Sequence, residues 1–210
     1  MNTTHIPLLN REIALLEFNS RVLAQAEDPN VPLLERLRYL CIVSSNMDEF
    51  FEIRMAGLKA QLDESPNKIL EDGSTTQESY NRITNFAHSL VAKKYSLFQG
   101  AILPALAKEK IHFKYHSVWT PKIHQWAKDF FHRELVPLLT PIALDPAHPF
   151  PRVINKSLNF LVALEGKDSF GRSASLAVVQ APRSLPRVVR LPKQFEASGE
   201  TSFILLSSFM

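Results

Sequence analysis

The sequence predicts an α+β protein: an N-terminal antiparallel bundle of helices over residues 1–108, then a domain of helix plus antiparallel strands over residues 109–210. Four segments with apolar residues at helical spacing occupy roughly the first hundred positions, a pattern typical of such a bundle. After Lys110 the helical period gives way to alternating apolar segments and frequent prolines. Because 45% of the 210 residues are hydrophobic, the chain can bury a sizeable core.

The first half contains four expected helices, at 10–27, 33–43, 47–62 and 76–108. A polar break with two prolines separates the first two, and Pro32 falls in the first turn of the second helix, where a missing N–H does no harm. Pro104 is expected to kink the end of the fourth helix, because it removes a hydrogen bond inside it.

A tight corner is predicted between the second and third helices, at Ser44–Asn46. An apolar run stops there at two serines and an asparagine, and two acids follow. Ser45 with Asp48, or Asn46 with Glu49, forms a capping-box pattern for the start of the next helix. The acids would also place negative charge at the positive end of that helix. We therefore expect this corner to fix the angle between two apolar helices.

The second half alternates between helix, strand and extended segments. Thr120 and Pro121 form a strong helix start, and this helix is expected to end before Pro137. A proline-rich run to Pro151 predicts ordered but extended chain. Strands are expected at 111–118, 158–164, 173–180, 187–191 and 202–207. The apolar end of the sequence, 203–210, suggests an unfinished core or sheet edge in a fragment of something longer, with a docked terminal strand as the alternative.

Composition narrows the class of protein. One cysteine, Cys41, excludes a disulfide framework and favours a reducing compartment. The first nine residues lack the apolar core of a secretory signal, and no stretch is apolar enough to span a bilayer. We therefore expect a cytoplasmic protein without a transmembrane segment, and peripheral attachment to the inner membrane stays open. A net charge of +3 is no nucleic-acid signature.

Asn46 is the most informative polar residue, and two roles are open for it. Local rules favour a helix cap, whereas a carboxamide that both donates and accepts would also suit an adenine edge. Tyr39, about two turns earlier, could supply an aromatic wall, although a partly buried core position is the simpler role. Asp48 and Glu49 are adjacent on a helix and point to different faces, so they form a poor Mg²⁺ chelate.

Residue patterns alone identify no catalytic group. His112 and His116 fall on a strand-like segment where their spacing separates them, and His124 and His132 are eight apart on a helix, too distant to share a metal. No HExxH or Cys/His pattern occurs, and no glycine-rich phosphate loop is present among only 6 glycines. The sequence therefore predicts neither a catalytic residue nor a metal site.

Several motifs together resemble one known family, the long-chain polyphosphate kinases. The resemblance to that family's N-terminal domain rests on Leu9-Asn10-Arg11-Glu12, Glu17-Phe18-Asn19, Arg21-Val22-Leu23, Pro32-Leu33-Leu34-Glu35-Arg36-Leu37 and Ser44-Ser45-Asn46-Met47-Asp48-Glu49-Phe50-Phe51. The stretch from Leu139 to Pro151, followed by Asn155-Lys156-Ser157-Leu158-Asn159, is similar to the start of its head domain. Leu15 and Met47 depart from the usual tryptophan and leucine, which are apolar exchanges that preserve packing.

The resemblance implies an enzyme that reversibly moves the terminal phosphate of ATP to polyphosphate through a phosphohistidine, with Mg²⁺. It places the histidine and the Mg²⁺ ligands in C-terminal domains, so these 210 residues alone are expected to be inactive. Asn46 corresponds to the family's contact with the adenine side of ATP or ADP. The head domain implies a homodimer or homotetramer, and both N-terminal domains help to enclose the polyphosphate tunnel.

Two other classes of function remain as alternatives. The first is a non-catalytic helical module that oligomerises or binds a partner. The second is a basic binder of nucleic acid or polyphosphate, for which a salt-dependent affinity would be the signature.

Overall fold

The structure is a computed structural model that describes residues 8–145, 149–166 and 175–210. The chain divides into two compact units, Met1–Glu109 and Lys110–Met210. The first unit is helical, and the second combines helices with two small sheets. The prediction of an α+β protein with a helical N-terminal region is therefore confirmed.

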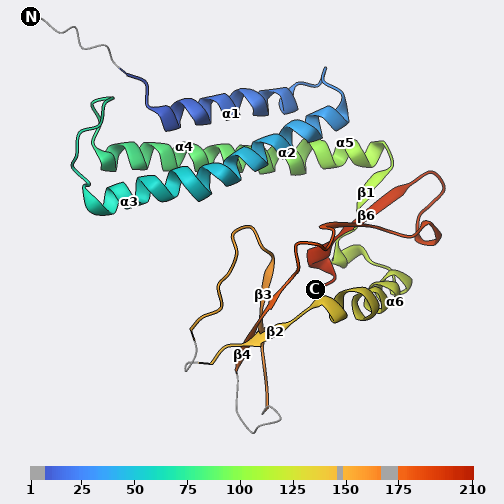
Figure 1. The fold of residues 1–210 in the computed structure, drawn as a ribbon. Helices are drawn as coiled ribbons and strands as arrows, with labels where there is room; N and C mark the ends of the chain where they lie inside the picture. The colour runs from blue at the N-terminus through green and yellow to red at the C-terminus, as the bar shows by residue number, and fades with distance from the viewer. Residues whose placement is uncertain (1–7, 146–148, 167–174) are drawn as a thin grey trace, which may run out of the picture. The chain divides into compact units, whose positions relative to one another are not determined.

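The first unit is built from three helical rods that run side by side (Figure 1). The first rod is α1 (Arg11–Glu27), which Asn10 caps by accepting hydrogen bonds from the backbone N–H groups of Glu12 and Ile13. The other rods each contain a π-helical turn: α2 (Leu33–Glu49), Phe50–Met55 and α3 (Ala56–Glu64); then α4 (Thr76–Leu97), Phe98–Ile102 and α5 (Leu103–Lys108).

The predicted corner at Ser44–Asn46 is wrong, because the helix passes through it without a break. Residues 33–64 are helical throughout, so neither Ser45 nor Asn46 is an N-cap and Asp48 and Glu49 lie far from a helix start. The reason is packing: Leu40, Val43, Met47 and Phe50 keep helical spacing across the polar triplet, and all four are buried. Continued burial outweighs the weak preference of serine and asparagine for helix ends.

The π-helical turns accommodate irregularities in the apolar pattern. Phe50 and Met55 are both buried and stand five residues apart, the spacing of a π turn. The turn Phe98–Ile102 precedes Pro104, which cannot donate a backbone hydrogen bond into an α-helical ladder. The expected irregularity near Pro104 thus takes the form of a wider turn.

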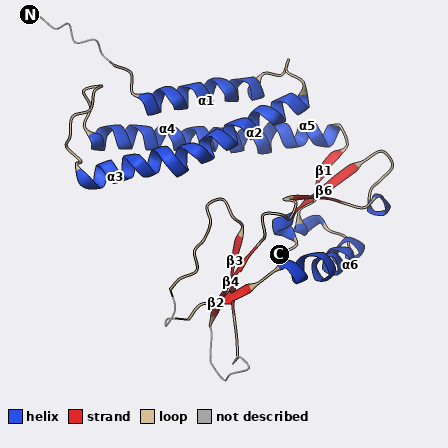
Figure 2. Cartoon of the chain, in the orientation of Figure 1, coloured by secondary structure: helices blue, strands red, loops and turns tan. Residues whose placement is uncertain are grey.

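The second unit contains α6 (Pro121–Phe130), continued by a π turn to Leu135, and two three-stranded sheets (Figure 2). The first sheet has the order β1 (Ile111–Phe113), β6 (Thr201–Leu205), β5 (Val188–Arg190), with β1 parallel to β6 and β5 antiparallel to it. The second is antiparallel, with β4 (Leu176–Gln180) between β2 (Pro141–Ala143) and β3 (Asn159–Ala163). Thr120 caps α6 as predicted.

Two expectations for the second unit need correction. The strand expected at 111–118 ends at Phe113, and a 3₁₀ turn occupies His116–Val118. The proline-rich run is not merely extended, because Pro141–Ala143 pairs as an edge strand, where a missing N–H is tolerated. The apolar C-terminal run starts in β6, which is central in its sheet as the docked-strand alternative expects, and Phe209 is buried in the core. Residues 146–148 and 173–174 of the predicted segments lie outside the described residues.

Candidate site around Asn46

Asn46 lies on α2, half-buried, with its amide directed at α1. Its Nδ2 donates a hydrogen bond to Oδ1 of Asn19 at 2.9 Å. Asn19 is fully buried, at 0% exposure, and its own Nδ2 donates to the backbone carbonyl of Leu15 at 3.0 Å. A carbonyl oxygen, a buried amide and a half-buried amide thus form a short chain of hydrogen bonds from α1 to α2.

This chain assigns the orientation of the Asn46 amide. Because the Leu15 carbonyl can only accept, Asn19 must turn its NH₂ group toward it and its oxygen toward Asn46. Asn46 must then present its NH₂ group to Asn19. Within the described residues no further hydrogen bond engages this amide, so one N–H and the carbonyl oxygen are available to a ligand. A donor and an acceptor side by side match the edge of an adenine.

Tyr39 shares a face of α2 with Asn46, because the helix is continuous. Seven residues make nearly two full turns, which places the two side chains about 10 Å apart along the axis. Tyr39 is half-buried, so a partial role in packing and a partly accessible ring coexist. Tyr39 and Asn46 therefore lie on one face of α2. They do so because the helix is continuous, whereas the sequence predicted a corner between them.

Asp48 and Glu49 do not form a cation site with each other. Both are exposed in mid-helix, and across the ranges that the structure describes no three His, Cys, Asp or Glu side chains gather as a metal would require. Asp48 acts instead on Lys94, whose pKa its charge raises against a larger lowering by burial. These residues consequently do not fit a Mg²⁺ ion.

A second polar cluster, missed in the sequence, ties the start of α1 to α4. Asp72 accepts hydrogen bonds from Ser74, Asn10 and Arg82 at 2.6, 3.1 and 3.0 Å. The Ser74 hydroxyl, followed by the Ser74 backbone N–H, Asn10 and Arg82, outweighs burial and lowers the pKa of Asp72 from 3.8 to about 2. Asp72 and Asn10 are 62 residues apart in sequence, so no local sequence pattern predicts their contact.

Two histidines of the second unit come together in the structure. His116 and His124, a pair that spacing did not suggest, approach edge to face with ring centroids 4.7 Å apart, and both contact Trp119. Both are exposed and belong to an aromatic cluster. No third ligand joins them within the described residues.

Comparison with known proteins decides the family. The polyphosphate kinase N-terminal domain matches residues 8–114, and the polyphosphate kinase middle domain matches residues 122–210. The chain belongs to the polyphosphate kinase family. It is 55% identical over 204 residues to polyphosphate kinases of Burkholderia vietnamiensis and Burkholderia lata, covering 97% of this chain and 30% of each relative.

The fold is similar to that of a relative whose structure is solved. The crystal structure of polyphosphate kinase from Porphyromonas gingivalis matches with a TM-score of 0.77 and 28% identity, over 97% of this chain and 29% of that protein. The present residues thus span about 30% of the length of their polyphosphate kinase relatives. No helix in the described part of the chain is long and apolar enough to cross a membrane.

Proposed function

We propose that these residues are the N-terminal part of an enzyme that reversibly transfers the terminal phosphate of ATP to polyphosphate through a phosphohistidine. The names of the relatives and the match to two successive polyphosphate kinase domains support this proposal. Mg²⁺ and the phosphohistidine would belong to other parts of the enzyme, as the resemblance to the family implies. The 210 residues alone are accordingly expected to bind ATP weakly and to transfer no phosphate.

Within that enzyme, Asn46 contacts the adenine of ATP or ADP. The observation that carries this assignment is the Asn19–Asn46 hydrogen bond, which holds the amide in one orientation and leaves a donor and an acceptor for the base. Adenine offers the complementary pair, its N6 amino group and a ring nitrogen. Tyr39, on the same face, would form an aromatic wall beside the base.

The test is the kinetics of the full-length enzyme with Asn46→Ala. A contact to the base acts alike in the ground state and the transition state, so the variant should raise the KM for ATP more than it lowers kcat. The loss of a hydrogen bond predicts an increase of about two- to tenfold in KM. Ser45→Ala, at the exposed neighbouring position, should leave KM unchanged. An unchanged KM for Asn46→Ala would remove Asn46 from the nucleotide site.

Assembly and location complete the proposal. We expect a homodimer or homotetramer formed through the second unit, and a cytoplasmic enzyme that can attach peripherally to the inner membrane. Exposed apolar residues on the β2–β4–β3 sheet support self-association: Ile142 and Leu161 flank Val178 in one row across the strands, and they are 45% and 63% exposed.

A further inference from the structure

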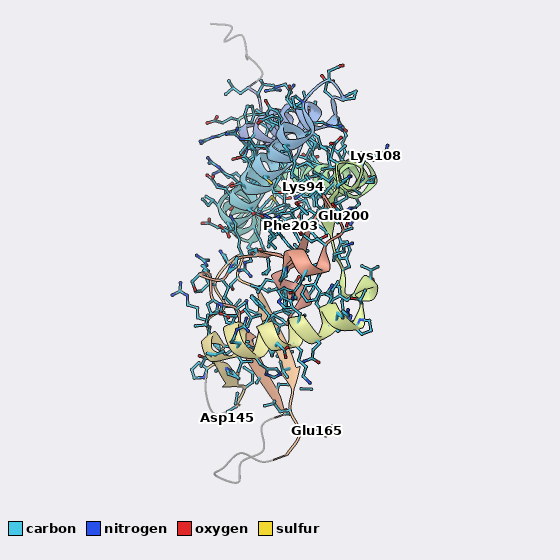
Figure 3. All side chains as sticks on the ribbon, turned by 90° about the vertical axis from the view of Figure 1, so that its right-hand side faces the viewer. Lys94, Lys108, Asp145, Glu165, Glu200 and Phe203 are labelled. Atoms are coloured by element: carbon cyan, nitrogen blue, oxygen red, sulfur yellow. The ribbon has the colours of Figure 1, made fainter. Side chains whose placement is uncertain are left out.

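Lys94 is the only buried lysine among the residues that the structure describes. The whole residue is 9% exposed and lies among the helices of the first unit (Figure 3). It belongs to α4 and points across to α2, where its Nζ donates a hydrogen bond to Oγ of Ser44 at 3.0 Å. Lys94 has no role in the proposed function, because its amine contacts Ser44, whereas the Asn46 amide is directed at α1.

The surroundings of the amine are mostly apolar. Nζ lies 4.4 Å from the ring centroid of Tyr95. Beside it is a cavity of about 190 Å³, lined besides Lys94 by Leu37, Leu40, Cys41, Ser44, Tyr95 and Phe98. One water molecule occupies about 30 Å³ in the liquid, so the cavity has room for a short acyl chain next to the nitrogen.

Burial destabilises the charged ammonium form of Lys94. Burial lowers the pKa of Lys94, and the charges of Asp48 and Cys41 on α2 only partly oppose it. On α4 the neighbouring group is the Tyr95 ring, which also stabilises the ammonium form. Lys93, the adjacent residue, is in the opposite situation: its side chain is 57% exposed and pairs with Glu27 at 2.9 Å. Two neighbouring lysines thus differ strongly in how well their ammonium forms are solvated and paired.

We propose that Lys94 is a site of covalent acylation by small activated acyl donors of the acyl phosphate class, with the cavity housing the acyl group. The neutral amine attacks the carbonyl carbon, a C–N bond forms, the C–O bond to phosphate breaks, phosphate leaves and the nitrogen releases one proton to solvent. The product is a neutral amide, whose burial costs far less than that of an ammonium. The Ser44 hydroxyl, which now accepts from Nζ, can donate to the new carbonyl oxygen.

The experiment uses acetyl phosphate as the probe and Lys93 as the internal reference. The purified protein is incubated with the probe over a pH series, and peptide mass spectrometry measures acetylation at both positions. A larger neutral fraction outweighs the lower intrinsic nucleophilicity of a weaker base, so Lys94 should be acetylated about threefold or more faster than Lys93 near pH 8. Its rate should also level off at a lower pH. Equal or faster modification of Lys93 would overturn the proposal.

A pair of exposed acids supplies the matched variants. Asp48→Asn removes a charge that favours the ammonium form, so acetylation of Lys94 should rise while that of Lys93 stays the same. Glu49→Gln removes the neighbouring carboxylate and should change neither. A fall in Lys94 acetylation in Asp48→Asn, or an equal rise at both lysines, would show that the pocket does not set the reactivity.

Discussion

At the scale of single residues, Asn19 and Asn46 differ in burial and in their hydrogen bonds. Asn19 is fully buried and hydrogen-bonds to both Leu15 and Asn46, whereas Asn46 is half-buried and donates one hydrogen bond to Asn19. Sequence reasoning selected Asn46 as a candidate ligand contact, through its motif and the chemistry of its carboxamide. It could not identify Asn19 as the partner, because the two are 27 residues apart and meet only when α1 packs on α2.

Asp72 supports a prediction about stability and pH. Its pKa is lowered in the folded protein to about 2 from 3.8, so its contribution is present above pH 4 and is lost as the pH falls toward 2. Asp72→Asn should therefore lower the free energy of unfolding by about 1–2 kcal/mol at pH 7, with the difference disappearing near pH 2. Urea unfolding at several pH values measures this. Asp63→Asn, at an exposed position, is the control, and a constant difference across the pH range would contradict the assignment.

At the scale of elements, the central finding is the unbroken helix from Leu33 to Glu64. Continuity places Tyr39 and Asn46 on one face, whereas a corner at Ser44–Asn46 would have made Ser45 or Asn46 a helix cap. The cap pattern was present in the sequence, but the apolar period that crosses it decides the outcome, because buried side chains contribute more free energy than a cap.

Alanine substitutions at Ser45 and Thr75 test this continuity by the sign of their effects. In mid-helix, Ser45→Ala should stabilise the protein slightly, by about 0.5 kcal/mol, because alanine has the higher helix propensity. Thr75 is a true N-cap with a capping box to Glu78, so Thr75→Ala should destabilise by about 1 kcal/mol. Chemical denaturation of both variants gives the comparison. If Ser45→Ala destabilised the protein as much as Thr75→Ala does, Ser45 would be a helix cap and the predicted corner would be correct.

Sequence reasoning succeeded where local rules and burial agree. The start of α6 follows from the capping residue Thr120, and β3, β5 and β6 follow from alternating apolar residues. It failed where distant contacts decide. β2 exists only because Pro141–Ala143 pairs with β4, and the parallel pairing of β1 with β6 joins residues some 90 positions apart.

At the scale of the whole molecule, the chain presents two compact units that match two successive domains of polyphosphate kinases. The candidate site belongs to the first unit alone. Among the described residues, no three His, Cys, Asp or Glu side chains gather as a metal site would require. The chain covers about 30% of the length of its polyphosphate kinase relatives.

Self-association through the second unit is tested by a charge on its exposed sheet. Leu161→Asp places a carboxylate in the row with Ile142 and Val178, where burial in an interface would be costly. We expect light scattering after size exclusion to show a dimer or tetramer for the unmodified protein and a shift toward monomer for the variant. Leu34→Asp, at a leucine of the first unit with similar exposure, should keep the original mass. An unchanged mass for Leu161→Asp would exclude this face.

We propose that Asn19 holds the amide of Asn46 toward adenine, and a double-mutant cycle on the KM for ATP of the full-length enzyme tests this role of Asn19. KM does not depend on the fraction of enzyme that is folded, so loss of stability does not confuse the result. If Asn19 acts through Asn46, each single alanine variant raises KM, and the double variant has the KM of Asn46→Ala within about twofold. Effects of the two substitutions that multiply in the double variant would show that Asn19 does not act through Asn46.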